Sequence, residues 1–534
     1  MSDDAPADDR PWKRPGAAAY RKARLRGIRR PPVTVTEVPD GLLVVDHDVP
    51  VTTRDGTVLR VNVHRPPDGE PRAVVLCAHP YGKDNLPTRG RRGWTIPRPY
   101  RMLRQPAPVS FSRLTGWEAP DPVWCVENGW VAANADLRGA GTSDGTGRLL
   151  SDQEGEDVAD LVEWAATQPW CNGRVATMGV SYLAISQWKA AALRPRGLRA
   201  IVVWEGFTDA YRDLLRPGGV RENGFLKIWS AGLRRTRLAY DLARESRSRP
   251  EYDEFWASLV PAVERIEVPA LVCGSFSDNN LHSRGSIRGF ERLGSAERHL
   301  WTHRGGKWAT FYGQEARRDQ RAFLRRHLDD GNDPPLPRVR LEVHESRDVS
   351  SVRAETAWPP PDAVPTRLHL TTTGLSPAPA TAPGSHRFDT RRGGFRIGWT
   401  APEDVEIVGP MRLRLPVEAS TELTLVTGVE LWRDGRYVPF EGSYGFGRDR
   451  VTTGWLRVPR REGVHEVDVE LGPSATRLRA GDQLRLVVAG RWLWPRNPLT
   501  GQFPAWYPPG PRGTATLHWG PGREAYLQVP LIRA

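Results

Sequence analysis

Residues 175–189, VATMGVSYLAISQWK, read as a strand, a sharp turn and the start of a helix. The glycine at 179 lets the turn close without a Cβ clash. The pattern predicts that Ser181 is lifted above the end of a strand, with the unpaired N–H groups of a helix N-terminus behind it. Such a serine suits nucleophilic attack. An ordinary strand-loop-helix serine also fits this stretch alone, because Leu183 stands where a second glycine is usual in nucleophile turns.

Strand-like and helical runs alternate on both sides of this turn. A helical pattern covers 154–168, and the apolar strand-like runs are AVVLCAHP (73–80), WVAANADLRG (130–139), RAIVVWEG (199–206) and PALVCGSFSD (269–278). An Asp-Gly turn at 55–56, between two alternating runs, predicts an additional hairpin. Alternation of this kind indicates a mostly parallel sheet wrapped by helices, and with the serine turn it predicts an α/β-hydrolase core.

Two changes in pattern divide the chain. Residues 207–265 are helical in pattern and rich in aromatic side chains, and an insertion after a strand's carboxyl end lies over the ligand side of such a sheet. After about residue 335, short alternating segments separated by turns predict an all-β jelly-roll sandwich. We therefore expect a basic N-terminal arm (1–40), a catalytic domain (41–206 and 266–335), a helical cap (207–265) and a sandwich (337–534).

The composition fits a folded enzyme better than a nucleic-acid-binding protein. The chain has 534 residues, 21 of them Trp, and a formal net charge of +13. Arginines are spread along the chain, and no zinc-finger spacing, RNP-type motif or basic region with heptads accompanies them. The four cysteines lie far apart, and no secretory signal or apolar run of membrane-spanning length is visible. We therefore expect a cytoplasmic location, no membrane and no nucleic-acid partner.

A serine nucleophile needs a histidine base and an acid, which in α/β-hydrolases follow the serine in the order acid, then histidine. Asp278 ends the apolar strand 269–278, so its carboxylate falls at the rim that carries the site. His303 ends the next strand-like run, before Arg304-Gly305-Gly306. The chain order therefore favours Asp278 as the acid and His303 as the base.

Other histidines are weaker candidates for the base. His282 lies four residues after Asp278 and is expected to start the following helix. His299 begins a strand below the rim, and His327 lies inside a helical run. For Asp278 itself, a role as a helix cap or turn residue is the alternative.

An oxyanion hole needs two hydrogen-bond donors near the serine. The residue after the nucleophile, Tyr182, supplies a backbone N–H. The loop after strand 73–79 begins His79-Pro80-Tyr81, and because proline has no N–H, the hydroxyl of Tyr81 is the expected second donor.

The whole set of motifs resembles one known family. HPYGK, ADLRGAGTSDG, GVSYLA, SFSD and WTH begin at residues 79, 135, 179, 275 and 301, in the order expected of CocE/NonD hydrolases, which include cocaine esterases, α-amino-acid ester hydrolases and X-Pro dipeptidyl-peptidases. The family's serine motif, G-X-S-Y-X-G, has no glycine at the Leu183 position. The resemblance implies Ser181 as nucleophile, Asp278 as acid, His303 as base, and Tyr81 with Tyr182 as the oxyanion hole.

The implied reaction is two-step acyl transfer on a small ester, or an amide, with no metal or organic cofactor. A homo-oligomer stays open, as do two alternative functions. An X-Pro aminopeptidase would need carboxylates to hold a free amine, for which Glu205 and Asp209 are candidates. A ligand-binding protein with an idle triad is the second alternative.

Overall fold

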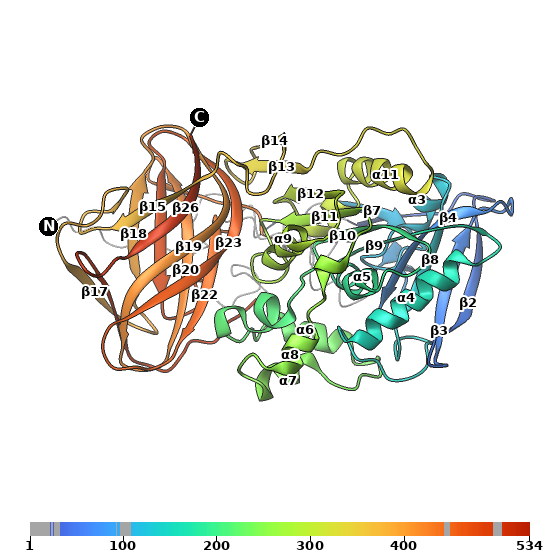
Figure 1. Cartoon of the computed structure of the whole chain (residues 1–534), viewed down its shortest axis with the longest axis horizontal. Helices are drawn as coiled ribbons and strands as arrows, with labels where there is room; N and C mark the ends of the chain where they lie inside the picture. Colours follow the sequence, from blue (N-terminus) through green and yellow to red (C-terminus); the bar gives the residue numbers. More distant parts are fainter. Residues whose placement is uncertain are drawn as a thin grey trace.

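A helix-wrapped sheet and a β-sandwich lie side by side in the computed structural model, and a helical segment lies beside both (Figure 1). The structure describes residues 33–91, 93–96, 108–442, 449–494 and 505–533, together with residues 22 and 25. Most of the expected N-terminal arm therefore lies outside the described residues.

The catalytic sheet has the strand order β2-β3-β8-β4-β9-β10-β11-β12-β13. Every neighbouring pair from β8 to β13 runs parallel, while β2 and β3 form the antiparallel hairpin predicted around Asp55-Gly56. The bounds of the strands are Val44–Thr52 (β2), Val58–Arg65 (β3), Arg72–His79 (β4), Val131–Asp136 (β8), Cys171–Val180 (β9), Leu198–Trp204 (β10), Ala270–Ser275 (β11), Arg298–His303 (β12) and Val339–His344 (β13).

The central strands of this sheet are apolar, and helices bury them on both faces. Helix α5 (Tyr182–Ala192) packs on β9 and β10 and against α4 (Asp152–Ala166). Helix α11 (Gln314–Leu328) contacts the same two strands, and α9 (Ser283–Arg292) packs on β11. The predicted α/β-hydrolase core is confirmed. The carboxyl ends of β9, β10, β11 and β12 meet at one edge, where the predicted site residues lie.

The helical segment between β10 and β11 consists of short elements. They are η2 (Tyr211–Leu215), η3 (Pro217–Gly219), α6 (Phe225–Gly232), α7 (Leu242–Ser248), α8 (Glu254–Ser258) and η4 (Val263–Arg265). Figure 1 shows α6, α7 and α8 along one side of the catalytic sheet, next to the sandwich. We call residues 207–265 the cap.

The C-terminal part is the predicted all-β sandwich. β19 (Val405–Ala419) is its longest strand and pairs antiparallel with β23 (His465–Leu478), β25 (Thr514–Trp519) and β26 (Tyr526–Arg533). β20 (Leu423–Arg433) pairs with β22 (Thr452–Val458) and β24 (Gln483–Ala489), and β24 with β18 (Phe395–Thr400). The outer strands are β15 (Val364–Leu370) on β26 and β17 (Gly384–Asp389) on β25. A separate apolar core fills the sandwich.

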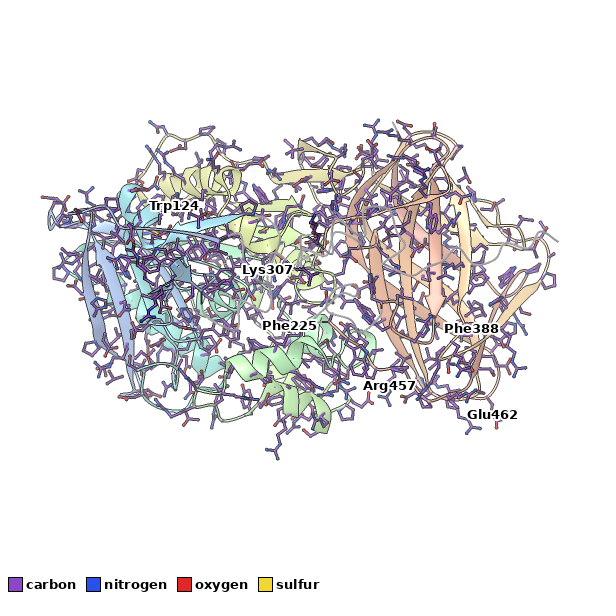
Figure 2. All side chains as sticks on the ribbon, turned by 180° about the vertical axis from the view of Figure 1, so that it is seen from behind. Trp124, Phe225, Lys307, Phe388, Arg457 and Glu462 are labelled. Atoms are coloured by element: carbon purple, nitrogen blue, oxygen red, sulfur yellow. The ribbon has the colours of Figure 1, made fainter. Side chains whose placement is uncertain are left out.

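Cap and sandwich meet closely. Gly218 of η3 has a φ of 57°, and a Cβ at this position would overlap the backbone oxygen of Trp455 in β22. Val220 packs into an aromatic cluster of the sandwich that includes Trp455, Trp492 and Tyr507. Arg457 of β22 also forms an ion pair of 2.6 Å with Glu251 of the cap, at the junction visible in Figure 2. No helix within the described ranges is long and apolar enough to cross a membrane.

Candidate active site

The predicted strand, turn and helix meet at Ser181. β9 ends at Val180, α5 begins at Tyr182, and Ser181 between them has φ 58° and ψ −119°, a conformation that L-residues rarely adopt. A Cβ at Gly179 would overlap that of Leu183, so the glycine is what allows the larger residue to pack inside the turn. The turn presents the partly exposed serine at the carboxyl edge of the sheet.

Ser181 has a histidine within hydrogen-bond distance, and that histidine is His282. The Oγ of Ser181 lies 3.1 Å from Nε2 of His282. His282 is the N-cap residue of α9, in the loop after β11, and its backbone N–H donates to the carbonyl oxygen of Asp278. A neutral imidazole with its proton on Nδ1 can therefore accept the serine proton at Nε2.

The sequence predicts His303 as the base beside Ser181, but in the structure His282 takes this place. His303 is the last residue of β12, and its Nε2 lies 3.1 Å from Oε1 of Glu205. Its Nδ1 lies 3.3 Å from the hydroxyl of Thr310. Both ring nitrogens of the buried imidazole thus face groups other than the serine. Since β12 stays regular up to His303, the side chain is held in the sheet and not on a loop beyond it.

Asp278 lies next to a lysine that the sequence interpretation overlooked. Nζ of Lys307, the first residue of α10 (Lys307–Phe311), is 2.8 Å from Oδ2 of Asp278 and 3.9 Å from Oε2 of Glu205. Both carboxylates are fully buried and Lys307 is 2% exposed. Such charges are tolerated in the interior because they compensate one another. Figure 2 shows Lys307 near the middle of the molecule, on the side toward the sandwich.

Burial and this lysine together determine the charge state of His282. The imidazole is stacked on Phe207, with ring centroids 5.5 Å apart. Loss of water, and then the positive charge of Lys307, lower the pKa of His282 well below 6.5. Among the residues that the structure describes, none forms a hydrogen bond with its Nδ1. His282 is therefore a neutral base held by packing and by its position at the start of α9.

A further buried carboxyl group, Glu118, belongs to the same surroundings. Its backbone oxygen accepts a hydrogen bond from Val180 N, which ties the loop after β7 (Val109–Ser112) to the serine turn. Its carboxylate accepts a hydrogen bond from Nε1 of Trp308 at 2.9 Å. Burial raises the pKa of Glu118 to about 7, despite the nearby charge of Lys307. The site therefore holds one lysine and three acidic groups beside the Ser181–His282 pair.

The two residues predicted for the oxyanion hole lie side by side. The rings of Tyr81 and Tyr182 meet edge to face, with centroids 6.1 Å apart. Tyr182 is the first residue of α5, a position whose N–H has no partner within the helix. Burial raises the pKa of the Tyr81 hydroxyl well above 10, so the group stays protonated and can donate a hydrogen bond.

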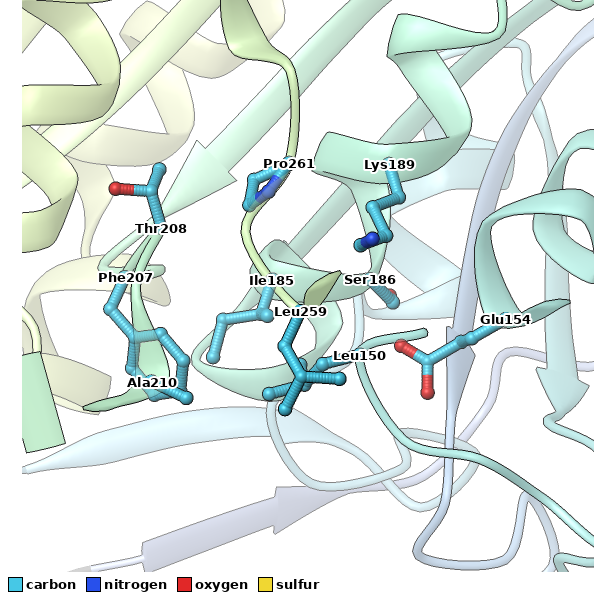
Figure 3. Close-up of a pocket in the computed structure, with 10 residues that line it drawn as sticks. All are labelled: Leu150, Glu154, Ile185, Ser186, Lys189, Phe207, Thr208, Ala210, Leu259 and Pro261. Carbon is cyan, nitrogen blue, oxygen red and sulfur yellow. The ribbon is translucent and has the colours of Figure 1, made fainter. Parts of the chain in front are cut away.

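The hydroxyl of Tyr182 points away from this hole. It donates a hydrogen bond of 2.7 Å to Glu154 of α4, whose pKa burial raises to about 7. Beside them lies a cavity of about 10 Å³, room for about one water molecule. Glu154, Ser186 and Lys189 line one side of this cavity (Figure 3). It is too small for a substrate.

Three residues near the site were not predicted from the sequence: Lys307, Glu118 and Trp229. None of them belongs to an ordinary Ser–acid–His triad, so the chain order of a triad gives no signal for them. Lys307 begins the short helix α10, Glu118 lies on the loop after β7, and Trp229 lies in the cap. The sequence does not reveal how these segments pack against Ser181. For His282 a signal was available, because a histidine four residues after an acid at a strand end sits one helical turn away from it.

A serine on a strained strand-to-helix turn, paired with histidine at the edge of an α/β sheet, defines a serine hydrolase. Comparisons with known proteins agree. Residues 55–244 match the family model of the X-Pro dipeptidyl-peptidase (S15 family), and residues 334–528 match that of the X-Pro dipeptidyl-peptidase C-terminal non-catalytic domain.

Individual relatives cover nearly the whole chain. A solved CocE/NonD family hydrolase from Staphylococcus aureus is 30% identical with a TM-score of 0.86, over 92% of this chain and 94% of that one. The cocaine esterase of Rhodococcus sp. is 25% identical, over 92% of this chain and 100% of the esterase. A solved α-amino acid ester hydrolase, 15% identical with a TM-score of 0.70 over 92% of this chain and 98% of that chain, shares the fold. The chain belongs to the CocE/NonD hydrolase family, as its motifs indicated.

Proposed function

We propose that the protein hydrolyses esters of small carboxylic acids through an acyl-enzyme intermediate, with Ser181 as nucleophile and His282 as general base. The observation that carries this proposal is the 3.1 Å contact between Ser181 Oγ and His282 Nε2 at the serine turn. Similarity to a cocaine esterase supports ester bonds as the substrate class.

The reaction proceeds in two steps. Ser181 Oγ attacks the carbonyl carbon while His282 Nε2 takes the serine proton. The tetrahedral oxyanion accepts hydrogen bonds from the Tyr81 hydroxyl and the Tyr182 N–H. His282 then gives its proton to the departing alkoxide oxygen, and the carbon–oxygen bond of the ester breaks. Water attacks the acyl-serine with His282 again as base, which releases the acid and restores Ser181.

The buried ion cluster influences the step in which His282 becomes positive. The charge of Lys307 by itself opposes the imidazolium, since it lowers the pKa of His282. Asp278, whose Oδ2 lies 2.8 Å from Nζ of Lys307, offsets part of that charge when it is ionised. We assign Asp278 to this electrostatic role, and not to a hydrogen bond with His303.

The aminopeptidase alternative has less support. It needs carboxylates that are available to a substrate amine, and Glu205 and Asp209 are the two candidates. Glu205 is fully buried and bonded to His303. Asp209 accepts hydrogen bonds from the backbone and guanidinium of Arg212. An amine would have to displace these partners, which disfavours peptides with a free N-terminus.

Two measurements test the proposal. A fluorophosphonate probe should label the wild-type protein and leave Ser181→Ala unlabelled. A panel of p-nitrophenyl esters with acyl chains of increasing size should then be hydrolysed faster than X-Pro p-nitroanilides or amino-acid amides. Faster cleavage of X-Pro substrates would show that the alternative is correct.

We also infer that the protein works in the cytoplasm. Its four cysteines are all unpaired, which fits a reducing compartment. A homo-oligomer stays a prediction, which sedimentation of the full chain would test.

A further inference from the structure

The cap reaches the oxyanion hole through one side chain, Trp229. This residue lies on α6, and its Nε1 donates a hydrogen bond of 3.1 Å to the hydroxyl oxygen of Tyr81. Its indole ring is stacked on the ring of Tyr182, with centroids 6.2 Å apart and planes 30° apart. Trp229 thus touches both residues that we assign to the oxyanion hole.

The direction of this hydrogen bond matters for catalysis. A tyrosine hydroxyl has one proton and can accept through its lone pairs, whereas an indole N–H can only donate. When Trp229 donates to the Tyr81 oxygen, the hydroxyl proton must point away from the indole. A hydroxyl that accepts one hydrogen bond is also a stronger donor in the next, because hydrogen bonds in series polarise one another.

The helix that carries Trp229 is anchored by a buried carboxylate. Glu222 is fully buried and accepts hydrogen bonds from the N–H groups of Gly224, Phe225 and Leu226 at 2.7 to 3.0 Å. These are the groups at the beginning of α6 that lack partners within the helix, and negative charge there is favourable. The start of α6 is thereby fixed.

The same carboxylate ties the helix to the sandwich. Glu222 Oε1 also accepts a hydrogen bond of 3.0 Å from the backbone N–H of Trp506, in a loop of the C-terminal domain. Asn223 N returns a hydrogen bond of 2.8 Å to the carbonyl oxygen of Trp506. A continuous series of contacts therefore runs from the sandwich loop, through Glu222 and α6, to Trp229 and the Tyr81 hydroxyl.

We propose that Trp229 is a positioning residue that orients the Tyr81 hydroxyl toward the oxyanion, and that Glu222 holds Trp229 in place from the sandwich side. The oxyanion hole is then complete only when the cap helix is seated. This inference rests on the proposed role of Tyr81 as an oxyanion donor, and the experiment below separates the two.

The test is a double-mutant cycle on kcat with a p-nitrophenyl ester. Trp229→Phe keeps an aromatic ring beside Tyr182 and removes the indole N–H together with part of the bicyclic ring. Loss of one hydrogen bond predicts a fall in kcat of about 3- to 10-fold. The same change in a Tyr81→Phe background should have no further effect on kcat, because there is no hydroxyl left to orient.

A matched control comes from the cap itself. Trp256 is a buried cap tryptophan whose Nε1 donates to the backbone oxygen of Arg249 and not to the site. Trp256→Phe should change the melting temperature without coupling to Tyr81→Phe in kcat. A purely structural role for Trp229 would make it behave like Trp256.

The outcomes are distinct. If Tyr81→Phe retains wild-type kcat, the proposed oxyanion role of Tyr81 fails, and this inference fails with it. If Tyr81→Phe is impaired while Trp229→Phe is fully active, or if the two losses multiply, only the positioning role is wrong. Coupled losses with KM nearly unchanged support it.

The anchor is tested with Glu222→Gln, which keeps the side-chain size but faces the N–H donors with an amide. A fall in kcat that disappears in the Trp229→Phe background supports the anchor. The anchoring role of Glu222 is overturned if Glu222→Gln has wild-type kcat. It is also overturned if the losses in kcat from Glu222→Gln and Trp229→Phe multiply in the double variant. A Glu222→Gln variant that does not fold also overturns a selective positioning role for Glu222. The role of Trp229 is then judged from the Trp229→Phe and Tyr81→Phe cycle alone.

Discussion

Nε2 of His282 lies 3.1 Å from Oγ of Ser181, although His282 follows β11 and not β12. The strand after which the histidine of an α/β-hydrolase is expected, β12, ends instead in His303, which is bonded to Glu205. A lysine, Lys307, opens the helix just beyond it and is paired with Asp278. In the proposed mechanism the base therefore lies in the same loop as Asp278, and the buried cation of Lys307 lies beside that carboxylate.

Replacement of the nucleophile should abolish turnover. Ser181→Ala is expected to lower kcat by roughly 10⁴- to 10⁶-fold, the loss typical of a missing serine nucleophile. The fold should barely change, because Ser181 is partly exposed and only its hydroxyl is lost. Steady-state kinetics and a thermal unfolding curve check both points. A variant that kept a tenth of the activity would exclude Ser181 as the nucleophile.

The two candidate bases should respond differently to substitution. His282→Ala is expected to lower kcat about as much as Ser181→Ala, and the double variant should be no worse than either, because the pair acts as a unit. His303→Ala should mainly lower the melting temperature. Among the described residues it leaves Glu205 with Lys307, 3.9 Å away, as its one charged partner within 4.0 Å.

His303→Gln is the matched control for that comparison, because its side-chain amide can still donate to Glu205. It should restore most of the stability lost in His303→Ala. The opposite kinetic result is a folded but inactive His303→Gln together with an active His282→Ala. It would show that His303 is the base, as the chain order predicts.

The pH dependence of kcat/KM should follow the low pKa of His282. The base works only when neutral, so activity rises with pH through its pKa. Burial and Lys307 hold that pKa well below 6.5, and the acid limb is therefore expected below pH 6.5. Lys307→Met removes a positive charge and leaves Asp278 and Glu205 unbalanced, so the limb should move to higher pH. An acid limb that does not move would show that the titrating group is not His282.

Removal of the second oxyanion donor should affect kcat more than KM. Tyr81→Phe is expected to lower kcat by roughly 10²- to 10³-fold, since such a donor acts mainly in the transition state. The rings of Tyr81 and Tyr182 would keep their packing. A variant nearly as active as wild type would mean that Tyr81 only fills space.

Sequence patterns could predict the fold because each signal is local. The run from 175 to 193 specifies strand, turn and helix through Gly179 and the apolar spacing, and the Asp55-Gly56 turn specifies its hairpin. The partner of Ser181 could not be predicted in this way. It depends on how the loop of residues 276–282 packs against Phe207 and Lys307, and on β12 staying regular through His303. Contacts between distant segments, which no local pattern encodes, decide these points.

The sandwich should be required for both stability and activity, because it contacts the loops that carry the site. Arg304, directly after His303, is fully buried and donates to the carbonyl oxygens of Arg450 and Val451, with its guanidinium 4.3 Å from the Phe440 ring. A Cβ at Gly472 of β23 would overlap Asn279, one residue after Asp278. Asn279 in the loop of residues 276–282, and Arg304 directly after β12, therefore both rest on sandwich backbone.

A fragment ending at residue 336, which lacks the sandwich and also strand β13 of the catalytic sheet, should accordingly aggregate and show no esterase activity. Its cap would lose the aromatic cluster around Val220, and the apolar surface exposed in this way would promote association between fragments. The soluble yield, light scattering and kcat of residues 1–336 are measured and compared with those of the full chain. As a control, the double variant Arg412→Ala/Arg414→Ala removes two partly exposed ion pairs within the sandwich, with Asp468 and Glu466, and should leave kcat unchanged. A soluble fragment with full turnover would show that the sandwich is dispensable, and the role assigned to its contacts with Arg304 and Asn279 would be wrong.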